Sequence, residues 1–373
     1  MPHLLHVFST FAVGGQQMRF VTLANGLGAR FRHTVLAMDG DLGAAAHLDP
    51  AIDCRFAEMP VVKSGGISLA NLRAARRLLW RERPDLLLTY NWGTVEWGIA
   101  NRLWPLVPQI HFEDGFGPDE SPVRQNPRRA LTRRLLFYGY GRIIVPSRTL
   151  FEVATGKWHV DAKRVTYLPN GIDCGRFAVP PDDEMVAALG IDPAALVVGT
   201  VAALRREKNL GRLLRVFAAL PERSARLVIV GDGAERAPMA AEATRMGIAD
   251  RVIFTGAMTR PEKLIGRFDI FALTSDTEQM PISMLEAMAA SRAVVATDVG
   301  DVRAILAAPN QDYVVDCADE AGFTAKLAEL LDAPASRAAL GEANRAHVAG
   351  KYALETMVGR YEELFRATIS GHD

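Results

Sequence analysis

The chain has 373 residues, of which 49% are hydrophobic and 23% carry a charge, and its 43 Lys and Arg residues balance its 43 Asp and Glu residues. This composition is typical of a folded protein of two or three domains and excludes a disordered chain, a collagen and a coiled coil. The sequence has no apolar run of the ~18 residues that a membrane span needs. Its three cysteines lie far apart and its N-terminus lacks a basic leader segment, so we expect a cytoplasmic protein.

The even charge balance conceals an asymmetry along the chain. Residues 1–172 contain 21 basic and 14 acidic residues, a net charge of +7, and the remaining residues have a net charge of −7. Seven arginines and no carboxylate lie between Ser121 and Phe151. Such an asymmetry suggests two domains that meet different partners.

The first half of the chain alternates short apolar runs with helical patterns. Helices are expected over Gln16–Leu27 and Leu69–Arg81. Strands are expected over Leu4–Ser9, His33–Ala37, Asp85–Tyr90, Gln109–Phe112, Arg142–Val145 and Arg164–Leu168. This alternation predicts right-handed βαβ units and a mostly parallel sheet.

A second series of the same kind follows a linker at 179–183. Its expected strands are Val197–Ala202, Ala225–Val230, Arg251–Thr255, Ile270–Thr274, Ala293–Ala296 and Tyr313–Val315. Helices are expected over Leu210–Leu220, Ala237–Met246, Pro281–Ala290, Phe323–Leu331 and, last, Tyr352–Thr368. The sequence thus predicts an α/β protein with two doubly wound parallel sheets. Because ligands of such sheets bind beyond the carboxyl ends of the strands, we expect a cleft between them, lined by the loops that follow strands.

The loop after the expected strand 270–274 carries Glu278, and the helix that follows carries Glu286. Proline suits the first position of a helix, so the helix is expected to begin at Pro281, and the free N–H groups around 280–283 suit a phosphate. Glu286 lies about 7.5 Å further along the helix axis. Two carboxylates then flank a phosphate site and can accept hydrogen bonds from the hydroxyls of a sugar and a ribose. On the local sequence alone, two solvated helix-end glutamates are the alternative.

A second loop of interest follows the expected strand 197–202 and contains Arg205 and Lys208. Arginine offers a planar fork and lysine a compact charge for the oxygens of a diphosphate. A solvated basic loop is the alternative.

The segment 275–289 resembles the E-x7-E signature of retaining glycosyltransferases of the GT-B fold, family 4, and Glu278 and Glu286 have the matching spacing. The resemblance continues in Pro169–Asp173, Val230–Gly233 and Val294–Gly300 and covers most of the chain. It implies two Rossmann-like domains: 1–178, joined by the C-terminal helix at about 352–373, and 179–351. It also implies a hexosyltransferase that uses a nucleotide-diphosphate sugar, with no metal and no other cofactor, in the manner of bacterial polysaccharide-assembly transferases.

The resemblance also assigns roles to residues of the second half. Glu278 contacts the hydroxyls of the donor sugar and Glu286 contacts the ribose. Lys208 and an arginine neutralise the leaving diphosphate, and Arg205 stands in for the arginine that many relatives carry in a Gly-Arg pair where this chain has Ala202-Ala203. The expected donor-binding residues are Gly15, Arg205, Lys208, Glu278, Met280, Pro281, Ile282, Ser283 and Glu286.

Two loops of the first half are candidates for the other side of the site. Gly14-Gly15 follows the first strand and lets a ligand approach a helix N-terminus, although a tight turn is the alternative. The loop 108–115 carries His111, Glu113 and Asp114, which can act as acid, base or charge stabiliser, or form a solvated loop with a capped helix. Relatives often place a histidine just before the glycine, where this chain has Asp114. Either Asp114 takes over the polar role or the chemistry is altered. The candidate catalytic residues are Asp114, His111 and Glu278, and the acceptor-side residues are Gly14, Glu113 and Gly115.

The arginine-rich stretch has a helical pattern over Arg128–Tyr138, with Leu131, Leu135 and Tyr138 on one face and Arg129 and Arg133 on another. A helix with an apolar inner face and a solvated basic face is one interpretation. The others are contact with a diphosphate-bearing acceptor or, at the inner face of the membrane, with anionic lipid. No nucleic-acid motif accompanies the arginines. The residues expected at a membrane are Arg124, Arg128, Arg129, Arg133 and Arg134.

The sequence therefore predicts transfer of a sugar to a lipid-linked or polysaccharide glycan intermediate. A sugar-nucleotide epimerase on the same fold and a non-catalytic nucleotide-sugar-binding subunit are the alternatives. The first rival would release no nucleotide, and the second would bind a donor without turnover.

Overall fold

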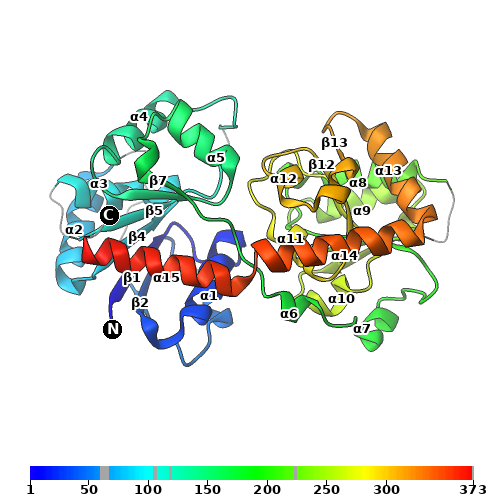
Figure 1. The fold of residues 1–373 in the computed structure, drawn as a ribbon, viewed down its shortest axis with the longest axis horizontal. Coiled ribbons are helices and arrows are strands. Elements are labelled where there is room, and N and C mark those ends of the chain that lie inside the picture. Colours follow the sequence, from blue (N-terminus) through cyan, green and yellow to red (C-terminus); the bar gives the residue numbers. More distant parts are fainter. Residues whose placement is uncertain (59–66, 104–106, 117–119, 222–224, 372–373) are drawn as a thin grey trace. The chain divides into compact units, whose positions relative to one another are not determined.

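The computed structural model describes residues 1–58, 67–103, 107–116, 120–221 and 225–371. The chain divides into two compact units (Figure 1). Unit 1 comprises Met1–Asn170 and Glu355–Asp373, and unit 2 comprises Gly171–Leu354.

Unit 1 is built on a seven-stranded sheet of order β3-β2-β1-β4-β5-β6-β7, and all of its strand pairs are parallel. β1 is buried along its whole length, which explains why its residues other than His3 and His6 are apolar. The strands are β1 (His3–Phe8), β2 (Arg32–Ala37), β3 (Cys54–Ala57), β4 (Leu86–Tyr90), β5 (Gln109–Phe112), β6 (Arg142–Val145) and β7 (Val165–Tyr167). The helices are α1 (Gly15–Leu27), α2 (Leu69–Glu82), α3 (Val95–Leu103), α4 (Pro127–Leu136), α5 (Arg148–Glu152) and α15 (Leu354–Ser370).

The last helix, α15, packs on unit 1. The Phe365 ring lies edge-on to Phe31, and the Tyr361 ring lies 6.0 Å from that of Phe112 in β5. The C-terminal segment thus completes the core of the N-terminal unit, although the whole of unit 2 separates the two in the sequence.

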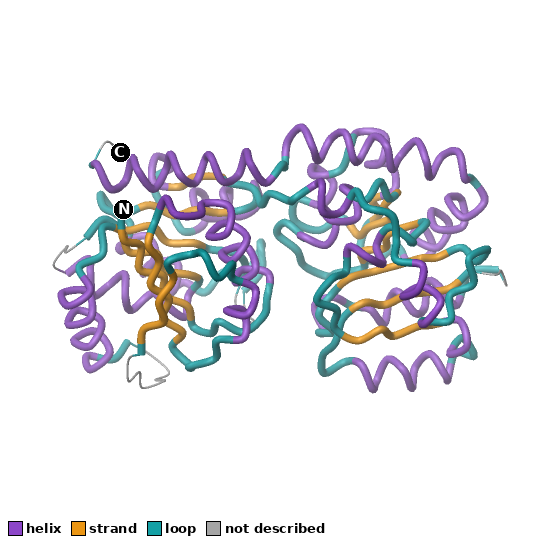
Figure 2. The backbone as a smooth tube through the Cα atoms, turned by 90° about the horizontal axis from the view of Figure 1, so that it is seen from below, coloured by secondary structure: helices purple, strands orange, loops and turns teal. Residues whose placement is uncertain are grey.

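Unit 2 contains a six-stranded parallel sheet of order β10-β9-β8-β11-β12-β13, with helices on both sides of the strands (Figure 2). Its strands are β8 (Val197–Val201), β9 (Arg226–Val230), β10 (Val252–Gly256), β11 (Ile270–Leu273), β12 (Ala293–Thr297) and β13 (Val314–Val315). Its helices are α6 (Cys174–Phe177), α7 (Asp183–Ala188), α8 (Leu210–Ala218), α9 (Arg236–Arg245), α10 (Glu262–Ile265), α11 (Ile282–Ala289), α12 (Val302–Ile305), α13 (Glu320–Asp332) and α14 (Pro334–Lys351). The predicted pair of doubly wound parallel sheets is confirmed.

The boundary between the units falls at Asn170 and Gly171, before the position at 178 that the sequence suggested. Ile172 and Phe177 are buried in the core of unit 2, and Ile172 forms a β-bridge with Ala353. The segment 171–178 therefore packs with unit 2 because its apolar side chains do.

Among the strands of the described residues, β3 is the one that the apolar runs did not indicate. It is a short edge strand with sequence Cys-Arg-Phe-Ala, and Arg55 and Phe56 are exposed. An edge strand needs no continuous apolar run, so the composition of this segment gave no signal.

Candidate active site

In unit 2, the candidate site begins where two neighbouring strands end. β8 and β11 pair in the sheet, so the loops that follow them lie side by side. Lys208, in the 3-10 turn Arg206–Lys208 after β8, donates a hydrogen bond of 2.6 Å from Nζ to Oε1 of Glu278. Ser275 donates from Oγ to the same oxygen at 2.7 Å. The Glu278 side chain is only 8% exposed, so these two donors hold it in one orientation.

A second set of contacts ties the same two loops together. The Asp276 amide donates to the carbonyl of Glu207 at 2.9 Å, and Nδ2 of Asn209 donates to the Asp276 carboxylate at 3.0 Å. Arg212, from α8, forms an ion pair with Asp276 at 2.8 Å. Glu278 therefore belongs to a loop that is fixed along its length.

Gly300, in the loop after β12, lies against the backbone of Glu278. Its φ of +54° favours glycine, and a Cβ at this position would overlap the carbonyl oxygen of Glu278. The glycine that ends the Val294–Gly300 segment is thus required by the close approach of the Glu278 loop.

α11 begins one residue later than expected, because Pro281 has ψ 112° and is the N-cap rather than the first helical residue. No side chain caps this end, so the first N–H groups of the helix, at Ile282 and Ser283, are available to an anion. Met280, which precedes the N-cap Pro281, is buried in the core of unit 2 and anchors the start of the helix.

Glu286 lies in the second turn of α11. Within the part of the chain that the structure describes, no donor lies within hydrogen-bond distance of its carboxylate. Burial raises the pKa of Glu286 to about 7, an effect that Arg176 opposes and Glu262 strengthens. A carboxylate with a raised pKa and no hydrogen-bond donor is a feature of functional sites, because a ligand can supply the hydrogen bonds that the fold does not.

Arg205 is placed differently from Lys208. Its side chain is exposed and lines a cavity of about 730 Å³ bounded by α8 and α9, together with Arg206 and Arg245. Among the described residues it makes no contact with Glu278. The structure thus brings Lys208 to the carboxylate but not Arg205.

In unit 1, Gly14 and Gly15 follow β1. Gly14 is the extended N-cap of α1, and no side chain caps this helix either. A Cβ on Gly15 would meet no heavy atom within 4 Å, so the first turn of α1 is open on this side.

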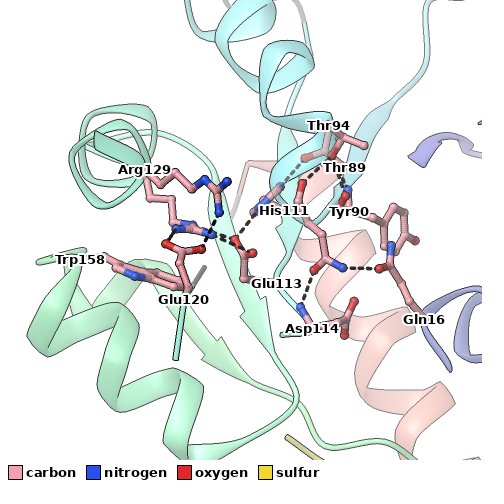
Figure 3. Close-up of polar contacts among 12 residues, drawn as sticks. Gln16, Thr89, Tyr90, Thr94, His111, Glu113, Asp114, Glu120, Arg129 and Trp158 are labelled. Atoms are coloured by element: carbon pink, nitrogen blue, oxygen red, sulfur yellow. Dashed lines mark hydrogen bonds and ion pairs between the residues drawn. The ribbon is translucent and has the colours of Figure 1, made fainter. Parts of the chain in front are cut away.

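Asp114 is held by Asn91, which follows β4, and by Arg19 of α1, and Figure 3 shows the hydrogen bonds that link Asp114 through Asn91 to Gln16. Its amide donates to Oδ1 of Asn91 at 2.7 Å, and Asn91 in turn donates from Nδ2 to Oε1 of Gln16. The guanidinium of Arg19, in α1, binds both carboxylate oxygens of Asp114 and lies 5.2 Å above the Phe112 ring. Burial raises the pKa of Asp114, and Arg19 opposes that shift. With a side chain 14% exposed, Asp114 is accessible at its edge.

His111 and Glu113 lie in the interior instead of lining a surface. His111 is in β5 and is 1% exposed; Nδ1 is 2.8 Å from Oγ1 of Thr89 and Nε2 is 3.3 Å from Glu113. Burial alone would raise the pKa of Glu113, but the Arg133 guanidinium and His111 lower it to about 2. Both ring nitrogens of His111 are occupied, so the catalytic role expected of His111 does not fit this position. The acceptor contact expected of Glu113 does not fit either.

The partner of Glu113 is Arg133 of α4, which corrects the predicted faces of this helix. Arg133 donates from Nε and Nη2 to Glu113 at 2.9 and 3.1 Å, contacts Glu120, and lies 4.1 Å from the centre of the Trp158 ring. Arg129 also turns inward to Glu120, at 3.2 Å (Figure 3). The expected basic outer face is thus partly an inner face, because two buried carboxylates attract its arginines. The acceptor-side residue Gly115 directly follows this cluster, and a Cβ there would meet no heavy atom within 4 Å.

Two family models match most of the chain: "Glycosyltransferase Family 4" over residues 13–176 and "Glycosyl transferases group 1" over residues 181–347. The D-inositol 3-phosphate glycosyltransferase of Corynebacterium urealyticum is 31% identical over 310 residues, which are 76% of this chain and 71% of that protein. The chain is a family 4, group 1 glycosyltransferase.

Other relatives and solved structures are similar to this glycosyltransferase over parts of its length or nearly all of it. The D-inositol 3-phosphate glycosyltransferase of Segniliparus rotundus is 27% identical over 78% of this chain and 67% of its own length. Several other curated relatives are matched over about half of their own length. The crystal structure of Anabaena Alr3699/HepE in complex with UDP has a TM-score of 0.82 and 18% identity, and covers 98% of this chain and 100% of that one. This likeness confirms the GT-B fold.

The candidate site includes residues that the sequence did not single out. Arg19 is the only charged residue in α1, and a lone arginine in an otherwise uncharged helix is a signal that could have been used. Asn91 has a φ of +55° directly after β4, and no residue pattern indicates that conformation. Within the described ranges, no group of three or more His, Cys, Asp or Glu side chains is arranged to hold a metal ion. No helix in those ranges is both long enough and apolar enough to span a bilayer.

Proposed function

We propose that this glycosyltransferase moves a hexosyl group from a nucleotide-diphosphate sugar to a hydroxyl acceptor, with retention of the anomeric configuration and without a metal ion. The main support for the proposal is the placement of the two glutamates: Glu278 lies in the loop before α11 and Glu286 lies in α11. The N-terminus of α11, which has no side-chain cap, lies between them in the sequence. A diphosphate suits the free N–H groups, and the two carboxylates suit the hydroxyls of the sugar and the ribose. The UDP in the related HepE crystal structure supports a nucleotide ligand.

The chemistry needs a stabilised leaving group. The bond between C1 of the sugar and the diphosphate oxygen breaks, the acceptor oxygen attacks C1 from the same face, and its proton passes to the departing diphosphate. Lys208 and the N–H groups of Ile282 and Ser283 neutralise the charge that develops on that diphosphate. Glu278, held by Lys208 and Ser275, fixes the sugar by its hydroxyls. Arg205, which lines the cavity between α8 and α9 and does not bind Glu278, adds positive charge at the edge of the donor site.

In unit 1, we assign substrate contact to Asp114 and to the backbone at Gly14, Gly15 and Gly115. The Arg19 guanidinium occupies both oxygens of Asp114, which makes the carboxylate a fixed hydrogen-bond acceptor rather than a proton carrier. The buried side chains of His111 and Glu113 anchor the loop that carries Asp114 to the interior of unit 1. The acceptor is a lipid-linked or polysaccharide glycan intermediate, in keeping with the +7 charge of residues 1–172, and the reaction takes place in the cytoplasm.

The test is an incubation of the full chain with UDP-, GDP-, ADP- and dTDP-sugars and a panel of glycan and polyprenyl-diphosphate-linked acceptors, in the presence of EDTA. We expect release of the nucleoside diphosphate and a product whose anomeric proton has the configuration of the donor. Conversion of the nucleotide sugar without release of nucleotide would instead indicate an epimerase. Donor binding without turnover for any acceptor would indicate a binding subunit.

A further inference from the structure

The outward surface of α4 carries leucines where a solvated helix carries polar residues. Leu131 is 55% exposed, Leu135 is 63% exposed, and Tyr138, just beyond the helix, is 76% exposed. With a spacing of three and four residues they form one row along the helix. Arg128 and Arg134 are exposed beside this row. We call these five residues the α4 surface.

The leucines of α4 face outward because Arg129 and Arg133 occupy the inner positions of the helix. Arg133 is 1% exposed and bound to Glu113 and Glu120, and Arg129 also pairs with Glu120. Leucines exposed one at a time are ordinary on protein surfaces. A row of two leucines and a tyrosine, with Arg128 and Arg134 exposed beside it, is the pattern of a docking face.

Charge identifies what this face meets. No carboxylate lies between Ser121 and Phe151. Among the described residues, the guanidinium groups of Arg124, Arg128 and Arg134 have no ion-pair partner. The unpaired Arg128 and Arg134 beside an apolar row match an anionic phospholipid surface, where the row enters the acyl boundary and the cations meet the headgroups.

The end of the neighbouring helix α3 lies beside the end of α4. Arg102, in the last turn of α3, donates from Nη2 to the carbonyl of Tyr138 at 2.9 Å, which joins the ends of α3 and α4. The next residue, Leu103, is 67% exposed. A second copy of the chain is a poor occupant, since a symmetric contact would bring the same arginines against one another.

We propose that the α4 surface docks the protein onto a bilayer that contains anionic phospholipid. Of the five arginines that the sequence suggested for such a contact, Arg124, Arg128 and Arg134 remain, while Arg129 and Arg133 belong to the buried cluster. This inference goes beyond the transferase reaction and does not depend on it, because binding to lipid can be measured without donor or acceptor.

The experiment is co-sedimentation of the full chain with vesicles of phosphatidylcholine, with and without phosphatidylglycerol. Leu131→Gln/Leu135→Gln is compared with Leu131→Met/Leu135→Met, because glutamine and methionine have similar size and helix propensity and differ in polarity. We expect the Gln pair to bind anionic vesicles about ten-fold more weakly than wild type, and the Met pair to bind as wild type.

The charge is tested in the same way. Arg128→Gln/Arg134→Gln removes two cations and is expected to weaken binding about thirty-fold, whereas Arg128→Lys/Arg134→Lys keeps the charge and the binding. All substituted side chains are exposed, so thermal unfolding is expected to be unchanged. No binding by the wild type, equal binding to both kinds of vesicle, or full binding by the Gln variants overturns the proposal. A wild-type dimer in light scattering that the Leu→Gln pair dissociates also overturns it.

Discussion

Lys208 and Glu278 are 70 residues apart in the chain and are joined by a hydrogen bond of 2.6 Å between Nζ and Oε1. They meet because β8 and β11, which precede their loops, are neighbours in a parallel sheet. One residue is a cation suited to a diphosphate and the other an acceptor suited to sugar hydroxyls, so this contact joins the two ends of the proposed donor site.

Replacing Lys208 with glutamine is expected to lower kcat/KM for the nucleotide sugar about a hundred-fold, because the leaving diphosphate loses a cation. Unfolding measurements are expected to show a loss of about 1–3 kcal/mol, since Glu278 loses a donor in a nearly buried position.

The matched control is Lys263→Gln, which breaks another 2.6 Å contact of unit 2, between Nζ of Lys263 and Oδ2 of Asp182. Its kcat/KM is expected to stay within about two-fold of wild type, as for a partly exposed ion pair that includes neither Lys208 nor Glu278. Equal losses of kcat/KM in both variants would remove Lys208 from the mechanism.

Glu286→Gln is expected to stabilise the fold and weaken donor binding. Because burial raises the pKa of Glu286 to about 7 from a usual 4.5, ionising it costs stability as the pH rises from 4.5 to 7, and the full cost is present above pH 7. Urea unfolding at pH 8 should therefore show a gain of up to about 3 kcal/mol for the variant. Glu363→Gln, an exposed site on α15, should change it by less than about 0.5 kcal/mol.

The same ionisation predicts how donor binding depends on pH. The affinity of the wild type for its nucleotide sugar should rise as the pH passes through 7, because the ionised carboxylate is the better acceptor for ribose hydroxyls. Calorimetric titration of Glu286→Gln should give a weaker affinity that is flat over this range. A nucleotide sugar is the right probe because its diphosphate is esterified at both ends and does not titrate there. If the donor affinity of Glu286→Gln depended on pH in the same way as that of the wild type, Glu286 would not contact the ribose.

Arg133 and its sequence neighbour Arg134 offer a direct comparison of a buried and an exposed cation. Arg133→Gln leaves Glu113 without its guanidinium and Glu120 with Arg129 alone, and is expected to cost about 3–5 kcal/mol of unfolding free energy. Arg134→Gln should change it by less than about 0.5 kcal/mol.

The Arg133 cluster also sets the response to acid. Glu113 has its pKa lowered to about 2, so its contribution to stability is complete above its usual 4.5 and is lost as the pH falls from 4.5 toward 2. Acid unfolding of Arg133→Gln, followed by circular dichroism, should thus begin at a higher pH than that of the wild type. Acid unfolding of Arg134→Gln at that same higher pH would contradict the assignment.

Gly15→Ala is expected to fold normally and to bind donor less well. The added Cβ meets no atom of the protein within 4 Å, and alanine is the better helix former at this position. Thermal unfolding should be unchanged or slightly higher, while KM for the nucleotide sugar rises several-fold because the methyl group occupies the open side of α1. An unchanged KM would show that no ligand approaches Gly15.

Much of the fold could be predicted from sequence because parallel strands buried on both faces are continuous apolar runs. β5 and β6 were predicted with their observed bounds, whereas the exposed edge strand β3 lacks such a run. The adjacency of Lys208 and Glu278 follows from the sheet order, since both lie in loops that follow neighbouring parallel strands.

The rest depends on partners that no local pattern contains. Arg19 pairs with Asp114, 95 residues later in the sequence. Arg133 turns inward because Glu113 and Glu120 lie beneath α4, and the periodicity of α4 alone gives the opposite face. An interpretation from helical periodicity places every arginine at the surface. That prediction is wrong where a buried carboxylate pairs with the arginine, as Glu113 does with Arg133.

The proposed donor site of unit 2 holds a nucleotide-diphosphate sugar between Glu278 and Glu286. Calorimetric titration of UDP-, GDP-, ADP- and dTDP-sugars into the wild type and into Glu278→Gln, with Glu363→Gln as control, tests this site most directly. We expect at least one nucleotide sugar to bind the wild type and the control equally, and to bind Glu278→Gln at least about ten-fold more weakly. Binding that Glu278→Gln leaves unchanged, or no binding of any nucleotide sugar to the wild type, would contradict it.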